Sequence, residues 1–190
     1  IIESLKLIPG QYFLVSSHRE ENVDSVDNLL RFIELLNVLA KKYNLPIIVS
    51  THPRTRNRME KLNLDIDPGI KFLKPFGFFD YVKLQIEAKC VLSDSGTITE
   101  ESSILNFSAL NLRETHERPE GFEEASVMLV GLNPDRVIQG IDILQAQPRG
   151  QKRLLELVDA YSPINVSDKV VRIIQSYTDV IRRKTWKDAT

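Results

Sequence analysis

The sequence is poor in the features that mark oxidised, membrane-bound or nucleic-acid-binding proteins. Its 190 residues include a single cysteine, Cys90, which excludes an internal disulfide and fits a reducing compartment. The 25 lysines and arginines nearly balance the 26 aspartates and glutamates, so no overall charge attracts nucleic acid or an anionic membrane. No apolar run approaches the roughly 18–20 residues that a membrane helix needs. We therefore expect a cytoplasmic globular protein whose partners include neither nucleic acid nor a membrane.

The sequence does contain a regular alternation of short apolar runs and stretches with helical spacing. The apolar runs predict strands over residues 12–15, 46–50, 70–73, 90–93, 109–112 and 127–130. The helical spacing predicts helices over residues 25–42, 54–62, 79–88, 97–105 and 133–145. Apolar strands separated by helices are typical of a parallel sheet covered on both faces. The pattern predicts an α/β fold, a doubly wound parallel sheet of the Rossmann-like type, whose strand order the sequence leaves open.

The last part of the chain breaks this alternation. Residues 151–160 and 168–183 have helical spacing, a break at Pro163 separates them, and no further strand follows. We expect residues 1–163 to form the sheet domain and residues 164–190 to form a trailing amphipathic helix. The apolar face of that helix packs either on its own sheet or on a neighbouring domain.

Ionisable side chains gather where the predicted strands end. All three histidines, His18, His52 and His116, follow predicted strands, together with several arginines and carboxylates. Ligands of an open parallel sheet bind beyond the carboxyl ends of its strands. Scattered surface residues would not gather on one edge, so the sequence predicts a ligand site there. Taken alone, His18 is equally well a solvated loop histidine, and His52 part of a structural turn.

The turn Asp94-Ser95-Gly96 after the fourth predicted strand has two interpretations. It is either an ordinary strand-to-helix turn, followed by a Thr97-x-x-Glu100 capping box, or a phosphate-binding turn. In the second interpretation, Ser95, Gly96 and the free amides of the first helical turn hold a diphosphate. The missing side chain of Gly96 then lets the phosphate approach the backbone.

Two neighbours of this turn extend the second interpretation to a nucleotide. Glu101, one helical turn beyond it, is placed to accept hydrogen bonds from ribose hydroxyls. Tyr81 is either core packing or an aromatic that stacks on a base, which contributes roughly 1–3 kcal/mol in nucleic-acid stacking.

Three motifs together resemble the non-hydrolysing bacterial UDP-N-acetylglucosamine 2-epimerases. They are His18-Arg19-x-Glu21-Asn22, Asp94-Ser95-Gly96 followed by Glu100-Glu101, and Glu117-Arg118-Pro119-Glu120, in the family's order and spacing. The resemblance covers residues 12–132. It implies the second, C-terminal domain of a GT-B-type enzyme, whose active site lies in the cleft between two Rossmann-like domains. It also implies that the first domain is missing from this chain and that the trailing helix crosses onto it.

The resemblance implies roles for individual residues. His18 corresponds to the catalytic histidine that contacts the diphosphate, and Ser95 and Gly96 correspond to the diphosphate-binding turn. Glu101 corresponds to the ribose-binding glutamate, and Tyr81 to the aromatic on the uracil. The other residues that line the cleft receive no individual role: Arg113, Glu117, Arg118 and His52.

The reaction that the resemblance implies inverts carbon 2 of a UDP-N-acetylamino sugar by eliminating UDP and adding it back. It needs no cofactor and no metal, and its acid and base carboxylates are expected in the missing domain. The implied partners are a UDP-sugar substrate and the chain's own first domain, with a homodimer left open at full length. We expect the chain alone to lack epimerase activity, because the cleft needs both domains to close.

Two departures from the family pattern indicate a particular branch of the family. Thr97 stands where the family commonly has a second glycine, and Ser17 where a glycine usually precedes the histidine. With residues 124–131, this variant resembles the capsule and O-antigen branch, which forms UDP-N-acetyl-L-fucosamine from UDP-2-acetamido-2,6-dideoxy-L-talose. Four alternatives stay open: an epimerase that forms UDP-N-acetylmannosamine, a hydrolysing epimerase, a GT-B glycosyltransferase donor domain, and a non-catalytic nucleotide-sugar-binding module.

Overall fold

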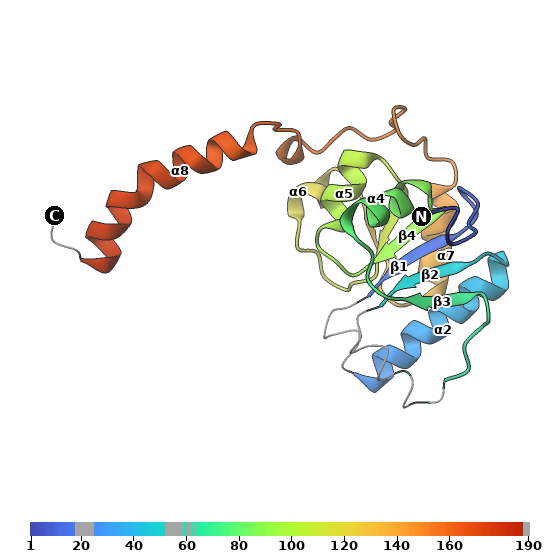
Figure 1. Ribbon diagram of the computed structural model, residues 1–190. Coiled ribbons are helices and arrows are strands. Elements are labelled where there is room, and N and C mark those ends of the chain that lie inside the picture. Colours follow the sequence, from blue (N-terminus) through green and yellow to red (C-terminus); the bar gives the residue numbers. More distant parts are fainter. Residues whose placement is uncertain (18–24, 52–58, 60–61, 63, 188–190) are drawn as a thin grey trace. The chain divides into compact units, whose positions relative to one another are not determined.

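The structure is a computed structural model that describes residues 1–17, 25–51, 59, 62 and 64–187. The chain divides into two compact units, Ile1–Val158 and Asp159–Thr190 (Figure 1). The first unit contains the whole sheet and its covering helices. The second contains a single long helix.

The sheet has six strands, all parallel. They are β1 (Phe13–Ser16), β2 (Ile47–Ser50), β3 (Ile70–Leu73), β4 (Cys90–Ser93), β5 (Ala109–Asn111) and β6 (Met128–Leu129). Their order in the sheet is β3-β2-β1-β4-β5-β6. The predicted doubly wound α/β fold is therefore confirmed. The chain reverses its direction of winding between β1 and β4, and such a switch point is where open sheets bind ligands.

The structure gives the bounds of five helices in the first unit. They are α2 (Val26–Tyr43), α4 (Phe78–Glu87), α5 (Ile98–Leu105), α6 (Pro119–Glu123) and α7 (Pro134–Leu144). Helices α2 and α7 pack with the side chains of one sheet face, while α4 and α5 pack with those of the other (Figure 1). Alternate residues of β1 belong to the two clusters: Phe13 and Val15 to the first, Leu14 to the second. This alternation explains why the strands are apolar on both faces.

The predicted starts of the helices over residues 25–42 and 133–145 agree with the structure, and a side chain caps each of them. Ser25 caps α2, with its Oγ accepting a hydrogen bond from the Asn28 amide at 3.4 Å. Asn133 caps α7, and Pro134 occupies its first turn. Asn133 Oδ1 accepts hydrogen bonds from the amides of Asp135 at 3.0 Å and Arg136 at 3.4 Å. These donors would otherwise lack a partner.

The prediction of a helix over residues 151–160 is wrong. This stretch is irregular up to a short 3₁₀ turn, Asp159–Tyr161. Its polar groups bond instead to distant helix ends: Arg153 donates to the carbonyls of Ser103 (2.7 Å) and Ile104 (2.8 Å) at the end of α5. Tertiary hydrogen bonds of this kind override a weak local preference for helix.

The second unit contains α8 (Val166–Ile181), followed by a π-helical turn, Arg182–Trp186. The predicted trailing helix is present, although it begins two residues earlier than expected. None of its residues is buried, and its exposed apolar side chains include Val170, Ile174 and Tyr177.

Two further observations concern helices. Of the predicted helix over residues 54–62, only Met59 and Leu62 are described, and both are helical. Among the described residues, no helix is both long and apolar enough to cross a membrane.

Candidate functional site

Three serines form the floor of a pocket at the switch point of the sheet. Ser16, Ser50 and Ser93 are the last residues of β1, β2 and β4, and the strand register aligns Ser16 with each of the other two. The pocket has a volume of about 400 Å³. Its other lining residues are Pro75, Phe76, Phe78, Tyr81, Ser95, Thr97 and Glu101. The structure thus brings together three of the residues predicted to bind the nucleotide: Tyr81, Ser95 and Glu101.

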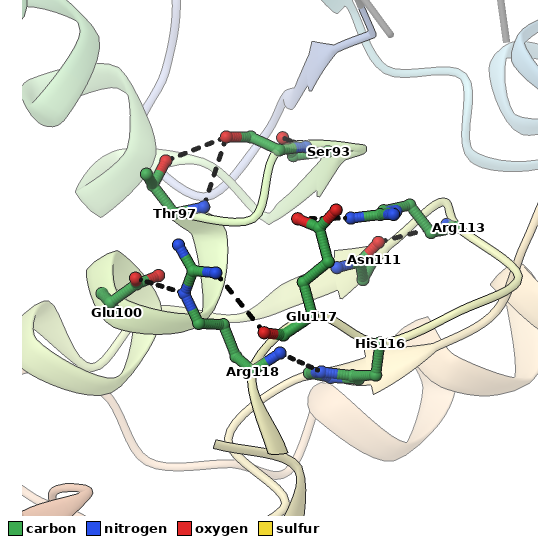
Figure 2. Close-up of polar contacts among 9 residues, drawn as sticks. Ser93, Thr97, Glu100, Asn111, Arg113, His116, Glu117 and Arg118 are labelled. Atoms are coloured by element: carbon green, nitrogen blue, oxygen red, sulfur yellow. Dashed lines mark hydrogen bonds and ion pairs between the residues drawn. The ribbon is translucent and has the colours of Figure 1, made fainter. Parts of the chain in front are cut away.

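The turn between β4 and α5 is built from hydroxyl groups. The Ser95 amide donates to Ser93 Oγ at 3.1 Å, and the Thr97 amide donates to Ser95 Oγ at 3.3 Å. The two hydroxyls of Ser95 and Thr97 are hydrogen-bonded at 2.9 Å (Figure 2). Within the described part of the chain, the Gly96 amide donates to no group. The Gly96 amide is therefore available to a ligand, whereas the Ser95 and Thr97 amides are already bonded within the turn.

The predicted capping box is wrong. Thr97 has helical backbone angles and its side chain makes no cap hydrogen bond, because its hydroxyl bonds to Ser95. The Glu100 carboxylate accepts a hydrogen bond from Arg118 Nε at 2.7 Å instead (Figure 2). A charged partner 18 residues away has displaced the local bond that the spacing suggested.

Glu101 and Tyr81 stand on neighbouring helices beside the pocket. One carboxylate oxygen of Glu101, Oε2, accepts a hydrogen bond from Gln85, a fully buried side chain of α4. The other oxygen makes no hydrogen bond within the described residues, so it can accept one from a ligand.

Tyr81 has a strongly perturbed hydroxyl. Its pKa is raised to about 12, mainly by burial and also by nearby Glu101 and Asp94, while a hydrogen bond with Ser16 works in the opposite direction. Tyr81 therefore stays neutral at physiological pH. Its ring can pack against a ligand without adding charge.

The segment after β5 lies against the same turn from the other side. Arg113 is buried, and its Nη1 lies 2.7 Å from Glu117 Oε2 (Figure 2). This contact is an ion pair outside hydrogen-bond geometry, and among the described residues the buried Nε of Arg113 has no hydrogen-bond partner either. Arg118 follows, with its guanidinium bonded to Glu100 on α5. The cleft-lining arginines and glutamate named from the sequence are therefore joined to the Ser95–Gly96 turn.

Gly96 is where the two segments meet. A Cβ at this position would lie 3.0 Å from Glu117 Oε2 and 3.6 Å from Arg118 Nη2. The sequence suggested that glycine leaves room for a phosphate. In the structure, the space beside Gly96 also adjoins the Glu117 carboxylate. Glycine is therefore needed to let Glu117 approach the turn as well.

Asp94 connects the turn to the end of β1. Its side chain is fully buried and accepts a hydrogen bond from Ser17 Oγ at 2.8 Å. Ser17 directly precedes His18 in the sequence, and this bond ties Ser17 to the turn after β4. His18 itself and His52 lie outside the described residues.

Sequence reasoning missed the serine floor and Gln85. A signal for the floor was present, since two predicted strands end on serine, at Ser50 and Ser93, and Ser16 directly follows a third. A buried glutamine on an amphipathic helix gives no such signal.

The fold is that of a Rossmann-like domain, with a pocket of hydroxyl groups, an aromatic ring and a carboxylate at the switch point. Comparison with known proteins goes further. The family model described as UDP-N-acetylglucosamine 2-epimerase matches residues 2–175. The chain belongs to this family of isomerases.

Individual relatives agree. The chain is 35% identical to a UDP-N-acetylglucosamine 2-epimerase of Methanocaldococcus jannaschii over 150 residues, covering 77% of this chain and 41% of that protein. The structure of the Rickettsia bellii UDP-N-acetylglucosamine 2-epimerase is 43% identical with a TM-score of 0.84, covering 98% of this chain and 50% of that one. The M. jannaschii enzyme in complex with UDP-GlcNAc and UDP is 32% identical with a TM-score of 0.76, covering 87% and 45%. This chain therefore spans about half the length of its relatives, or less.

Proposed function

We propose that this chain is the C-terminal, UDP-binding half of a UDP-sugar 2-epimerase. The observation that carries the proposal is the pocket at the switch point, which joins Tyr81, Ser95 and Glu101 in a chain of this family. The span of about half the relatives' length supports a two-domain enzyme whose first domain lies outside this sequence.

The pocket supports a particular orientation of UDP. The diphosphate lies at Ser95 and the free Gly96 amide, where the start of α5 adds partial positive charge. The free oxygen of Glu101 accepts hydrogen bonds from the ribose. The uracil packs on Tyr81, and Phe76 and Phe78 add apolar surface beside it.

Inversion at carbon 2 is achieved by elimination and re-addition. The bond between carbon 1 and the diphosphate oxygen breaks, UDP leaves with the electron pair, and a base removes the carbon 2 proton to give a glycal. UDP then returns to carbon 1 while the proton is delivered to the other face of carbon 2. This half of the enzyme stabilises the leaving diphosphate, and the acid and base carboxylates belong to the other half.

His18 and the Ser95–Gly96 turn supply that stabilisation. A well-aimed donor to developing negative charge contributes roughly 3–4 kcal/mol in oxyanion holes. His18 takes this role by resemblance.

The trailing helix, residues 164–190, belongs to the contact with the first domain. Helix α8 exposes Val166, Val170, Val171, Ile173, Ile174, Tyr177 and Ile181. An amphipathic helix normally buries its apolar face against another part of the protein, but α8 has no buried residue. This supports the first domain as the surface that covers it.

The product that the sequence favours is UDP-N-acetyl-L-fucosamine, for capsular polysaccharide or O-antigen synthesis. Thr97 and residues 124–131 support this branch. Epimerisation to UDP-N-acetylmannosamine is the second candidate, supported by the activity in the relatives' names.

A UDP titration tests the binding proposal, with UMP and ADP as comparison ligands. We expect UDP to bind more tightly than either, and both His18→Ala and Glu101→Gln to weaken it. Glu123→Ala, on α6 and outside the pocket, serves as the control and should bind UDP as the unmodified chain does. UDP binding that ignores both site substitutions would contradict the site.

The activity test requires the first domain. Adding that domain should produce carbon 2 inversion of a UDP-sugar, detected by NMR of the product, while this chain alone should produce none. The product formed from UDP-2-acetamido-2,6-dideoxy-L-talose or from UDP-N-acetylglucosamine distinguishes the two branches. Transfer of the sugar to an added acceptor without inversion would favour a glycosyltransferase.

A further inference from the structure

The hydroxyls of Ser95 and Thr97, at the start of α5, are hydrogen-bonded to each other. Ser95 Oγ receives the Thr97 amide hydrogen at 3.3 Å and contacts Thr97 Oγ1 at 2.9 Å. Both side chains line the pocket. A serine hydroxyl has one hydrogen to donate and two lone pairs to accept with. The Thr97 amide already fills one of those lone pairs.

The proposed function determines the direction of the remaining bond. A diphosphate that is fully ionised has only hydrogen-bond acceptors, so Ser95 binds it by donating its single hydrogen. With that hydrogen engaged, the bond between the two hydroxyls can exist only if Thr97 donates and Ser95 accepts. Both lone pairs of Ser95 are then filled by Thr97, one by its amide and one by its hydroxyl.

We propose that Thr97 is a positioning residue that makes Ser95 a dedicated hydrogen-bond donor to the diphosphate. Two donors feeding one hydroxyl polarise it, which strengthens the bond that it gives. They also fix the Ser95 hydroxyl in one direction, so less rotational freedom is lost when the ligand binds. The inference rests on the proposed function, because it requires the diphosphate to lie at Ser95.

The Thr97 hydroxyl is not needed to form the turn. The amide of any residue but proline at position 97 can donate to Ser95 Oγ, and the Thr97 hydroxyl makes no cap hydrogen bond to α5. Thr97 is also exposed, so its hydroxyl is not a buried group that must find a partner. Its contact with Ser95 is therefore an addition to a turn that forms without it.

The test measures the binding of UDP and of uridine to the chain and to four variants: Thr97→Val, Thr97→Ser, Ser95→Ala and the double variant Ser95→Ala with Thr97→Val. Thr97→Val keeps the shape and removes the hydroxyl, whereas Thr97→Ser keeps the hydroxyl. We expect Thr97→Val to weaken UDP binding by about 3- to 10-fold, the range for one hydrogen bond. Uridine binding should not change, because uridine carries no phosphate. Thr97→Ser should bind UDP as the unmodified chain does.

The double variant separates an indirect role from a direct one. If Thr97 acts through Ser95, adding Thr97→Val to Ser95→Ala has no further effect on UDP binding. An additional loss in the double variant would mean that Thr97 contacts the ligand itself, which overturns the proposal. An equal loss for uridine would mean a structural role and would also overturn it.

Failure of the proposed function gives a different result. If the unmodified chain binds UDP no better than uridine, the diphosphate does not lie at this turn, and both proposals fail together. If it prefers UDP and Thr97→Val keeps that preference in full, only the role of Thr97 is wrong.

Discussion

The Arg113 guanidinium holds the Glu117 carboxylate against the turn that carries Gly96. Arg113 Nη1 lies 2.7 Å from Glu117 Oε2, and the same oxygen lies 3.0 Å from the position of a Cβ on residue 96. The Arg113 side chain is 5% exposed and that of Glu117 is 37% exposed. The segment after β5 thus lies close against the turn after β4.

Glu117→Gln should destabilise the protein. It leaves the buried Arg113 guanidinium without a countercharge, which costs about 3–5 kcal/mol for fully buried pairs. Because Glu117 is partly exposed, water screens the loss, and we expect about 1–2 kcal/mol in the free energy of unfolding. Urea unfolding measures this. Glu87→Gln is the matched control, since its partner Lys83 is 54% exposed, and it should cost about 0–0.5 kcal/mol. Equal losses in the two variants would contradict the importance of burial.

Gly96→Ala should also destabilise the protein and should weaken UDP binding. The new methyl group pushes Glu117 away from its place, and its ion pair with Arg113 resists the shift. Overpacking of this size costs about 1–3 kcal/mol. Gly77→Ala is the control, because a Cβ at position 77 meets nothing within 4 Å and its backbone angles suit alanine. If the two alanine variants unfold at the same urea concentration, Glu117 moves aside freely.

Much of the fold followed from apolar patterning. The predicted limits of β3 and β4 agree with the structure, because four-residue apolar runs between turn residues allow little else. The strand order did not follow, because it depends on which strands pair across the sheet, and β1 pairs with β4 across a long stretch of intervening chain.

The failures of prediction have a common cause. Thr97 and Glu100 had the spacing of a capping box, and residues 151–160 had the spacing of a helix. Arg118 bonds to Glu100 and the end of α5 bonds to Arg153, so partners distant in the sequence captured these two side chains, while the Thr97 hydroxyl bonds to Ser95. Local spacing contains no information about such partners, so these sites could be found only from the structure.

Arg153 should stabilise the sheet domain although it lies in an irregular segment. Its guanidinium donates to the carbonyls of Ser103 and Ile104, at the negative end of α5. Arg153→Met removes both charged hydrogen bonds, and we expect a loss of about 1–3 kcal/mol in the free energy of unfolding. Removing residues 164–190 should change that free energy little, since α8 contributes no buried residue. A larger loss from the truncation than from Arg153→Met would contradict the division into two compact units.

Alkaline pH should destabilise the protein in two stages. Burial raises the pKa of the Cys90 thiol from 9.0 to about 12, and burial with nearby carboxylates raises the pKa of Tyr81 from 10.0 to about 12. The folded chain therefore holds these protons more tightly than the unfolded chain does. The stabilisation is complete below the unfolded pKa values and is lost as pH rises toward about 12.

Cys90→Ala separates the thiol from the tyrosine. In the unmodified protein, the free energy of unfolding should begin to fall near pH 9, where the unfolded thiol ionises. In Cys90→Ala it should stay level until about pH 10, where the unfolded tyrosines begin to ionise. The variant is less stable at neutral pH because it removes a buried sulfur, so the comparison is between slopes and not between absolute values. Urea unfolding at closely spaced pH values gives the slopes, and equal slopes between pH 9 and 10 would show that the folded thiol ionises as readily as the unfolded one.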